Sequence, residues 1–384
     1  LYVNNQNGTF SEKVSEYFKH TSHFAMGNDV GDINNDGLDD IVVMDMLPED
    51  HFRRKLMFGA TQYNKFYYAV NHDYTYQYMR NTLQLNNGNG SFSEIGQMAG
   101  IYKTDWSWAV LLADFNNDEY QDLYITNGFG KDITDLDFVK FRSSITSNIK
   151  NEESRRKVLL DSLAERPGIK VSDYAYRNNG NLSFTKVTRE WGFEAPNYSN
   201  GVAYADFDND GDLDLVVSNI DDVAQVYRNK QRDNNPLDAN YLRVKLVGTD
   251  LNKSGIGSKV IIRYNGKLQS KLKSVVRGFE STVEDILHFG LGRVRQIDTL
   301  EVRWPDGKTS FLTDVKTNQL VEINYKTGIS VPSKKNSDIP IFEACDFKLI
   351  PFQHKENPFI DFNHEPLLPR KLSQEGPGLA VGDV

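Results

Sequence analysis

The sequence has little of what marks disulfide-rich, membrane-spanning or nucleic-acid-binding proteins. One cysteine in 384 residues excludes a disulfide framework within the chain. No apolar run approaches the roughly 18 residues that a membrane-spanning helix needs. The formal net charge is −9, which argues against a nucleic-acid partner, because such proteins present a basic surface.

Catalytic signatures are missing as well. The Gly-x-Ser-x-Gly nucleophile motif, the His-Glu-x-x-His metalloprotease motif and Cys/His metal clusters do not occur. The seven histidines are scattered, although His20, His23, His51 and His72 lie in or near one aromatic-rich stretch. The sequence therefore identifies no enzyme, and an acid/base site near those histidines stays open as an alternative.

What the sequence does contain is a nine-residue acidic run that occurs three times, at 32–40 (loop 1), 114–122 (loop 2) and 206–214 (loop 3). Each run stands directly before a short apolar strand. Side-chain oxygens at positions 1, 3, 5 and 9, with a backbone carbonyl at position 7, make the oxygen cage that Ca²⁺ prefers. The predicted ligands are Asp32, Asn34, Asp36, Leu38 and Asp40; Asp114, Asn116, Asp118, Tyr120 and Asp122; and Asp206, Asp208, Asp210, Asp212 and Asp214.

An EF-hand shares part of this spacing but needs a Glu at position 12 between two helices. Here position 12 is Val43, Ile125 or Val217, each in a strand-like run, so the EF-hand is excluded. Asp/Asn-rich turns without metal remain the alternative. Loop 3 has four carboxylates where the other loops have three, which predicts the tightest binding there. In loop 2, Glu119 replaces the glycine of the other loops, so whether loop 2 binds calcium stays open.

A second repeated element sets the period. Asn-rich hairpins begin at Asn4, Asn86 and Asn178, and each is followed 28 positions later by the first Asp of an acidic loop. The shortest complete unit is 51 residues, which suits a four-stranded β-propeller blade. We therefore predict an all-β fold, with a partial β-propeller over residues 1–237 and insertions at about 47–80 and 131–170.

The insertions are predicted to lie at the opposite end of the blades from the acidic loops. The first carries nine aromatic residues between positions 52 and 78, and the second has helical spacing from position 138 onward. Rings at this end form a candidate surface for binding protein or glycan, although they could equally serve to pack the insertions. The candidates are Tyr63, Tyr67, Tyr74, Tyr76, Trp106, Trp108, Trp191 and Tyr198.

Beyond the repeats, short alternating strands punctuated by glycines predict a compact antiparallel β domain at 238–326. Residues 327–375 are polar and contain several prolines, which predicts a linker. The last residues, 376–384, repeat the start of an acidic loop and predict the beginning of a further propeller repeat.

The acidic loops with their following strands resemble FG-GAP/VCBS repeats, the calcium-loop blades that also occur in integrin α-subunit heads. The stretches at 275–281, 287–292 and 300–308 resemble the ASPIC/UnbV domain. This pairing is found in cartilage acidic protein-like proteins and in surface proteins of Bacteroidetes-type bacteria. The resemblance implies that the loop residues above are calcium ligands, but it implies no settled biochemical activity.

These observations predict a calcium-binding propeller at the cell surface, outside the cell or in a bacterial periplasm. Calcium would be structural, and the partner would be a protein or a glycan. The alternatives are a polysaccharide lyase or hydrolase with its site on the aromatic insertion face, and a structural spacer without a further ligand.

Overall fold

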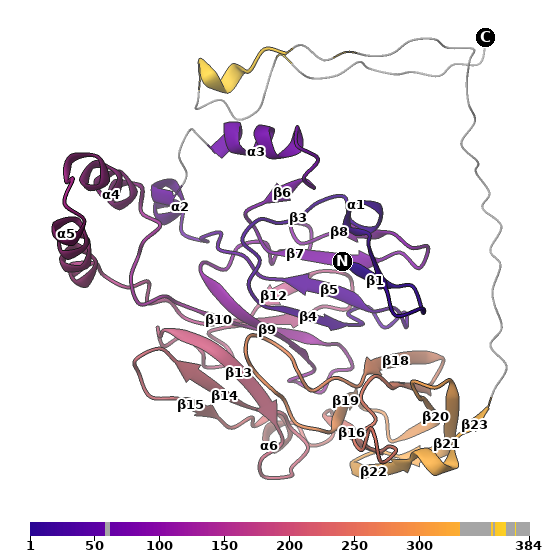
Figure 1. The fold of residues 1–384 in the computed structure, drawn as a ribbon. Helices are drawn as coiled ribbons and strands as arrows, with labels where there is room; N and C mark the ends of the chain where they lie inside the picture. Colours follow the sequence, from indigo (N-terminus) through magenta and orange to yellow (C-terminus); the bar gives the residue numbers. More distant parts are fainter. Residues whose placement is uncertain (58–61, 331–354, 356–357, 366–372, 374–384) are drawn as a thin grey trace, which may run out of the picture.

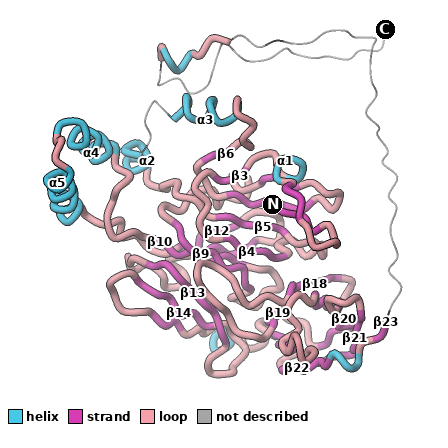
Figure 2. The backbone as a smooth tube through the Cα atoms, in the orientation of Figure 1, coloured by secondary structure: helices cyan, strands magenta, loops and turns pink. Residues whose placement is uncertain are grey.

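The computed structural model describes residues 1–57, 62–330, 355, 358–365 and 373. The chain is mostly β-sheet with few helices (Figures 1 and 2), which confirms the predicted all-β class. Within the described residues, no helix is both long and apolar enough to cross a membrane.

The repeated part of the chain folds into antiparallel sheets whose strands follow one another in sequence order, and we call these sheets blades 1, 2 and 3. Blade 1 consists of β4 (Asn28–Gly31), β5 (Asp40–Val43), β7 (Thr82–Asn86) and β8 (Phe92–Glu94). Blade 2 consists of β9 (Ser107–Ala113), β10 (Asp122–Asn127), β11 (Tyr174–Asn178) and β12 (Phe184–Lys186). Blade 3 consists of β13 (Ser199–Ala205), β14 (Asp214–Asn219) and β15 (Gln225–Tyr227).

Blade 3 departs from the predicted repeat. It has three strands within the described residues, where the 51-residue unit predicted four. After β15 the chain enters a short helix, α6 (Gln231–Asn234). It then continues into the β domain that begins at β16 (Asn240–Val247), which we call the downstream domain. Before blade 1, β1 (Tyr2–Asn4) and β2 (Phe10–Glu12) form a separate hairpin, followed by α1 (Val14–Tyr17).

The blades pack face to face through apolar side chains. Strand β9 is buried on both faces, so alternate residues serve the two interfaces. Val110 and Leu112 pack in the core between blades 1 and 2, whereas Ala109 and Leu111 pack in the core between blades 2 and 3. This alternation explains why the strand reads as a continuous apolar run.

The insertions are helical. The first contains α2 (His51–Met57) and α3 (Gln62–Val70), then β6 (Gln77–Tyr78), which pairs in parallel with β3 (Thr21–Ser22). The second contains α4 (Leu136–Asn148) and α5 (Glu152–Glu165), as its spacing predicted. Asp135 and Asn151 cap the two helices by accepting backbone N–H bonds. No residue of α5 is buried, so its charges face solvent. Helices α4 and α5 project from the blades on the side away from the downstream domain (Figure 1).

The downstream domain consists of two sheets around one apolar core. One sheet has the order β19-β16-β22 and the other β18-β17-β20-β21-β23. The prediction of a purely antiparallel domain is wrong in one place, because β16 and β22 pair in parallel. The strands are β16 (Asn240–Val247), β17 (Lys259–Tyr264), β18 (Lys267–Leu272), β19 (Leu287–Gly292), β20 (Gln296–Arg303), β21 (Lys308–Lys316), β22 (Gln319–Asn324) and β23 (Ile329–Ser330).

Two short 3-10 helices complete the described elements, at Tyr325–Thr327 and Asp361–Asn363. Most of the predicted linker at 327–375 and all of the predicted further repeat at 376–384 lie outside the described residues.

One stretch of the downstream domain, residues 275–284, contacts the first strand of all three blades, and we call it the crossing segment. Arg277 Nη1 lies 2.6 Å from Asp29 Oδ1 on β4. Gly278 lies beside β9, where an added Cβ would be 3.4 Å from the Ala109 Cβ. Ser281 Oγ accepts a hydrogen bond of 3.1 Å from the Val202 N–H on β13. The crossing segment therefore ties the downstream domain to the blades.

Candidate metal-binding loops

The three acidic loops share one hydrogen-bond scaffold. In each, the Asp at position 1 accepts the backbone N–H groups of positions 5 and 6, and the Asp at position 5 accepts the N–H of position 7. The position 1 bonds measure 3.1 and 2.8 Å in loop 1, 3.0 and 2.9 Å in loop 2, and 3.1 and 3.0 Å in loop 3. Because these bonds are local, the repeated sequence folds into the same turn each time.

Two positions in each loop adopt positive φ. At position 4 the Asn residues have φ of 60°, 57° and 59° in loops 1, 2 and 3. At position 6, Gly37 has φ of 87°, Gly211 of 92° and Glu119 of 87°. Glu119 therefore takes the strained backbone that the sequence predicted for a glycine position. Its carboxylate lies 2.5 Å from Lys267 Nζ of the downstream domain. The residue that replaces glycine in loop 2 therefore forms an ion pair with that domain.

The Asp at position 9 joins its loop to the third strand of the same blade. Asp122 Oδ2 accepts the N–H of Phe115 at 3.1 Å, and its Oδ1 accepts the N–H of Asn178 at 2.9 Å. Asp40 and Asp214 make the equivalent pairs of bonds. A carboxylate oxygen has two lone pairs, so each of these oxygens retains capacity for a further ligand.

Neighbouring loops are also bonded to each other. Asn35 Nδ2 of loop 1 donates to the Glu119 carbonyl at 3.1 Å, and Asn117 Nδ2 of loop 2 donates to Asp212 Oδ1 at 2.8 Å. Hairpin asparagines reach back in the same way, since Asn178 Nδ2 donates to the Ile33 carbonyl at 2.8 Å. The loops thus form one continuous polar network across three blades.

The downstream domain covers this network, which the sequence did not predict. Ser270 Oγ donates to Asp32 Oδ2 at 3.1 Å, and Lys259 Nζ to the Gly37 carbonyl at 2.8 Å. His288 Nε2 lies 2.7 Å from Asn117 Oδ1. These partners are separated by 171 to 238 residues in sequence, so no local motif could have revealed them.

Burial makes the loop carboxylates unfavourable as isolated charges. It raises the pKa of Asp40 to about 6. Burial also raises the pKa of Asp114 well above its ordinary value, with repulsion from Asp118 as the next cause. The pKa of Asp122 is raised well above its ordinary value by burial and then by Asp114 and Asp118. A cation bound among these groups would favour their ionised forms.

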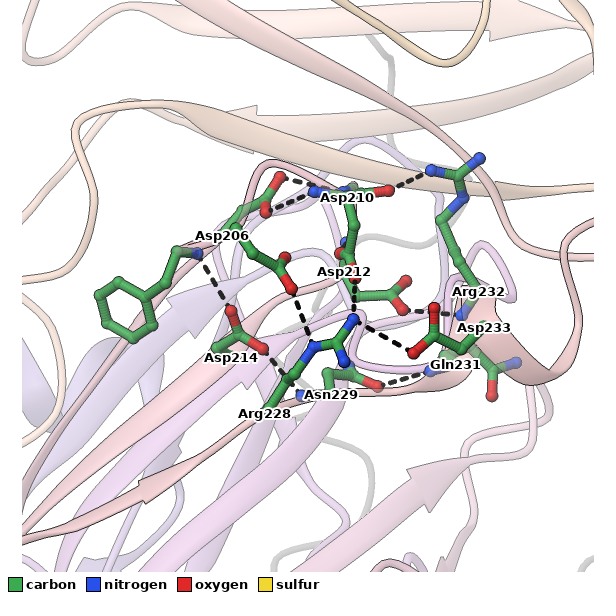
Figure 3. Close-up of polar contacts among 12 residues, drawn as sticks. Asp206, Asp210, Asp212, Asp214, Arg228, Asn229, Gln231, Arg232 and Asp233 are labelled. Carbon is green, nitrogen blue, oxygen red and sulfur yellow. Dashed lines mark hydrogen bonds and ion pairs between the residues drawn. The ribbon is translucent and has the colours of Figure 1, made fainter.

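Loop 3 brings three carboxylates together. One oxygen from each of Asp206, Asp208 and Asp210 comes within 4.8 Å of the other two, close enough for the three carboxylates to share a metal ion. Two arginines contact the same carboxylates: Arg228 Nε is 2.8 Å from Asp208 Oδ2, and Arg243 Nη1 is 2.9 Å from Asp206 Oδ2. Figure 3 shows Arg228 pointing toward Asp210 from the strand side of the loop.

Loop 1 contains a buried acceptor that lacks a protein partner. Asn34 Oδ1 is buried and makes no hydrogen bond with the described residues. The other side of the amide is used, since Asn34 Nδ2 donates to Asp36 Oδ2 at 2.9 Å. A buried oxygen without a donor is unfavourable unless something else binds it. Asn34 occupies position 3, where the spacing predicts a metal ligand, so the chemistry of this site fits Ca²⁺.

The predicted aromatic residues at the other end of the blades do not form one surface. Tyr63, Tyr67, Tyr74 and Tyr76 lie in the first insertion, where Tyr67, Tyr74 and Tyr76 are exposed. Trp106 is instead buried and stacked on Phe129 at 4.2 Å. The remaining three lie elsewhere: Trp108 beside Phe279, Tyr198 beneath Lys170, and Trp191 near Phe115 of loop 2.

Comparison with known proteins agrees with this architecture. Residues 1–43, 67–125 and 168–217 match the FG-GAP-like repeat, and residues 248–330 match the model described as ASPIC and UnbV. Cartilage acidic protein 1 from Mus musculus is 30% identical over 273 residues, covering 64% of this chain and 41% of that protein. The Xenopus tropicalis protein gives the same values, and the Homo sapiens protein is 29% identical over 40% of its length.

The chain thus spans about two fifths of the length of these relatives. The matched repeats contain all three acidic loops, and the ASPIC and UnbV match contains the crossing segment. The chain therefore contains FG-GAP-like repeats followed by an ASPIC and UnbV domain, and it is homologous to cartilage acidic protein 1.

Proposed function

We propose that this chain is part of an extracellular or cell-surface binding protein whose acidic loops hold calcium ions. The observation that carries the proposal is the common scaffold of the three loops, in which carboxylate and amide oxygens gather at fixed positions around one turn. The close oxygens of Asp206, Asp208 and Asp210 support it, as does the unpartnered Asn34 Oδ1. Calcium takes six to eight such oxygens.

Calcium would serve stability rather than chemistry. The ion would be held by the oxygens of positions 1, 3, 5, 7 and 9, and it would supply positive charge among buried carboxylates. Because neighbouring loops are bonded to each other and to the downstream domain, neutralising one loop stabilises the network around it. The binding free energy is then also folding free energy.

A calcium-dependent melting experiment tests this proposal. Asp210→Ala removes one of the three clustered carboxylates of loop 3. We expect a clear fall in melting temperature in calcium, by several degrees, and a much smaller fall in chelator, because the ion contributes stability only when it is bound. Equal losses in both buffers would overturn calcium binding at loop 3.

Asp233→Ala is a matched control for that variant. Asp233 also contacts Arg228, at 3.1 Å, but it lies in α6, outside the loop (Figure 3). We expect this control to leave the difference between calcium and chelator unchanged, so that loss of an arginine contact is separated from loss of a metal ligand.

The binding surface for a protein or glycan is proposed at the first insertion. Tyr67, Tyr74 and Tyr76 are 40%, 64% and 50% exposed, and a cavity of about 390 Å³ beside them is lined by Tyr63 and Phe66. Exposed aromatic rings are suited to stack on sugars or to anchor a protein partner. A glycan array with the intact protein, repeated with Tyr74→Ala and Tyr76→Ala, tests this surface; unchanged binding by both variants would contradict it.

An enzyme acting on a polysaccharide is the second candidate. His23 lines the same cavity, and its Nδ1 lies 3.1 Å from Gln77 Oε1. An imidazole beside aromatic rings could transfer a proton in a lyase or hydrolase. Incubation with defined polysaccharides separates the candidates, since binding without product formation excludes turnover of those substrates.

A further inference from the structure

The aspartate at position 1 of each acidic loop has two oxygens with different partners. In loop 1, and among the described residues, Asp32 Oδ1 accepts one hydrogen bond, from the Asp36 N–H at 3.1 Å. Asp32 Oδ2 accepts two, from the Gly37 N–H at 2.8 Å and from Ser270 Oγ at 3.1 Å. Each carboxylate oxygen has two lone pairs, so both pairs of Oδ2 are used and Oδ1 retains one. The oxygen that is left for an ion is therefore Oδ1.

Loop 3 repeats this division with a different partner. Asp206 Oδ1 accepts the Asp210 N–H at 3.1 Å. Asp206 Oδ2 accepts the Gly211 N–H at 3.0 Å and lies 2.9 Å from Arg243 Nη1 of the downstream domain. The Arg243 guanidinium also forms an ion pair with Glu284, so part of its positive charge is balanced outside the loop. Again the downstream domain contacts Oδ2.

Loop 2 meets the downstream domain through the backbone of β19. A Cβ added at Gly290 would lie 2.0 Å from Asp114 Oδ2, so an alanine there would collide with the carboxylate unless one of them moved. Two residues further on, the Gly292 N–H donates to the Asn117 carbonyl at 2.8 Å. The position 1 oxygen that lies against the downstream domain is thus Oδ2 in all three loops.

The residues that contact these oxygens belong to three strands of the downstream domain. Ser270 lies on β18, Arg243 on β16 and Gly290 on β19. Ser270 is 1% exposed and Arg243 5%, so the surrounding structure holds both donors in place. Groups that hydrogen-bond a ligating carboxylate fix its orientation, and their loss typically lowers metal affinity by about 10–100-fold. The downstream domain is therefore built to orient the position 1 carboxylates.

We propose that the downstream domain prepares the acidic loops for calcium, with Ser270 and Arg243 as positioning residues for Asp32 and Asp206. This inference rests on the proposed calcium binding and adds that calcium affinity depends on the docked downstream domain. By thermodynamic linkage, bound calcium then strengthens the docking of that domain by the same factor. The ASPIC and UnbV domain is, in this proposal, a part of the calcium sites.

Calorimetric titration of the full chain with calcium tests the role of Ser270. Ser270→Ala removes the donor to Asp32 Oδ2 and leaves every predicted calcium ligand in place. We expect the affinity of one site to fall by about tenfold. Asp32→Asn identifies that site, because it should abolish the binding transition of loop 1. Adding Ser270→Ala to Asp32→Asn should then change the remaining transitions by less than about twofold.

Ser281→Ala is the matched control. Ser281 also connects the downstream domain to a blade, but its hydrogen bonds are with Val202 and Phe279, and neither is a predicted ligand. We expect this control to leave calcium affinity unchanged. Equal affinity of Ser270→Ala and the unaltered chain, or equal losses in the two serine variants, would overturn the inference and leave the proposed function standing. Absence of calcium binding by the unaltered chain would overturn both.

Hydrogen exchange of the unaltered chain measures the reciprocal effect and needs no variant. The Gly292 N–H bonds across to loop 2, whereas the Trp304 N–H bonds to the Lys308 carbonyl at 2.8 Å, inside the downstream domain. We expect calcium, compared with chelator, to slow exchange at Gly292 by at least about tenfold and at Trp304 by much less. Equal slowing of both amides, or calcium binding without slowing of either, would also overturn the inference.

Discussion

The two ends of the blades differ in how the connections between strands are built and held. At the loop end, three copies of one turn are bonded to each other and covered by the downstream domain. At the insertion end, the connections differ in each blade: those of blades 1 and 2 contain helices, of which α5 buries no residue, and that of blade 3 is a short turn between β14 and β15. The same strands therefore carry a repeated, interlocked end and an end whose connections vary from blade to blade.

This difference separates the end that holds the blades together from the end at which partner binding is proposed. Buried charges at the loop end are tolerated only because each has a partner, so a change there affects several blades at once. Exposed rings at the insertion end, such as those of Tyr74 and Tyr76, form the surface at which partner binding is proposed.

Arg277→Met should produce the largest loss of stability. Arg277 and Asp29 form an ion pair of 2.6 Å between the crossing segment and blade 1, and both side chains are buried. Removing the arginine leaves Asp29 as an unpaired buried charge, which costs about 3–5 kcal/mol in the free energy of unfolding. Urea unfolding measures the change.

A surface pair provides the control for Arg277→Met. Lys245 and Glu322 lie 3.6 Å apart and are about half exposed. Lys245→Met should change the free energy of unfolding by less than about 1 kcal/mol. Similar losses for the two variants would contradict the claim that the loop end is held by buried charges.

His288 should make stability depend on pH. Asn117 Nδ2 already donates to loop 3, so Asn117 Oδ1 accepts from His288 Nε2–H, and the buried Nδ1 has no partner within the described residues. Burial lowers the pKa of His288 well below 6.5, and the positive charges of Lys271, Arg243 and Arg232 lower it further. The folded protein therefore keeps His288 neutral.

The direction of the pH effect follows from this shift. As pH falls through about 6.5, the unfolded chain binds the proton while the folded chain does not, so stability is lost. The loss should be about 1 kcal/mol between pH 6.5 and 5.5. His288→Gln should lack this component, so urea unfolding of both proteins across that range isolates it. Parallel pH profiles would show that the folded protein binds the proton as readily as the unfolded chain.

Arg228→Ala should strengthen calcium binding at loop 3. Arg228 contacts Asp208 and Asp210, so a bound ion has to compete with its guanidinium. Exposed pairs of this kind are weak, which predicts an affinity increase of at most about fivefold. Calorimetric titration with calcium measures it. Arg189→Ala, which removes an exposed contact with Glu194, should leave the affinity unchanged.

The sequence alone was sufficient to predict the parts of this molecule that are held by local contacts. The acidic loops, their strands and the helices of the second insertion follow from spacing, because their hydrogen bonds join residues a few positions apart. The calcium ligands themselves stay a prediction.

Contacts between segments that are distant in the sequence could not be predicted from the spacing of residues. Nothing in the alternation of the downstream strands indicated that β16 and β22 pair in parallel, or that Arg277 would reach Asp29 across 248 residues. The aromatic residues show the same limit, since Trp106 lies in the predicted segment but packs inward on Phe129.

Replacing residues 136–165 with a short Gly/Ser linker should have the smallest effect on stability. Helix α4 buries Phe138 and Ile145 but α5 buries nothing, so the blades lose few contacts. We expect the free energy of unfolding to change by less than about 1 kcal/mol and the response to calcium to be retained. Urea unfolding with and without calcium measures both quantities. A loss of unfolding free energy as large as that of Arg277→Met would mean that both ends of the blades contribute similarly to stability. That result would contradict the proposed difference between the two ends.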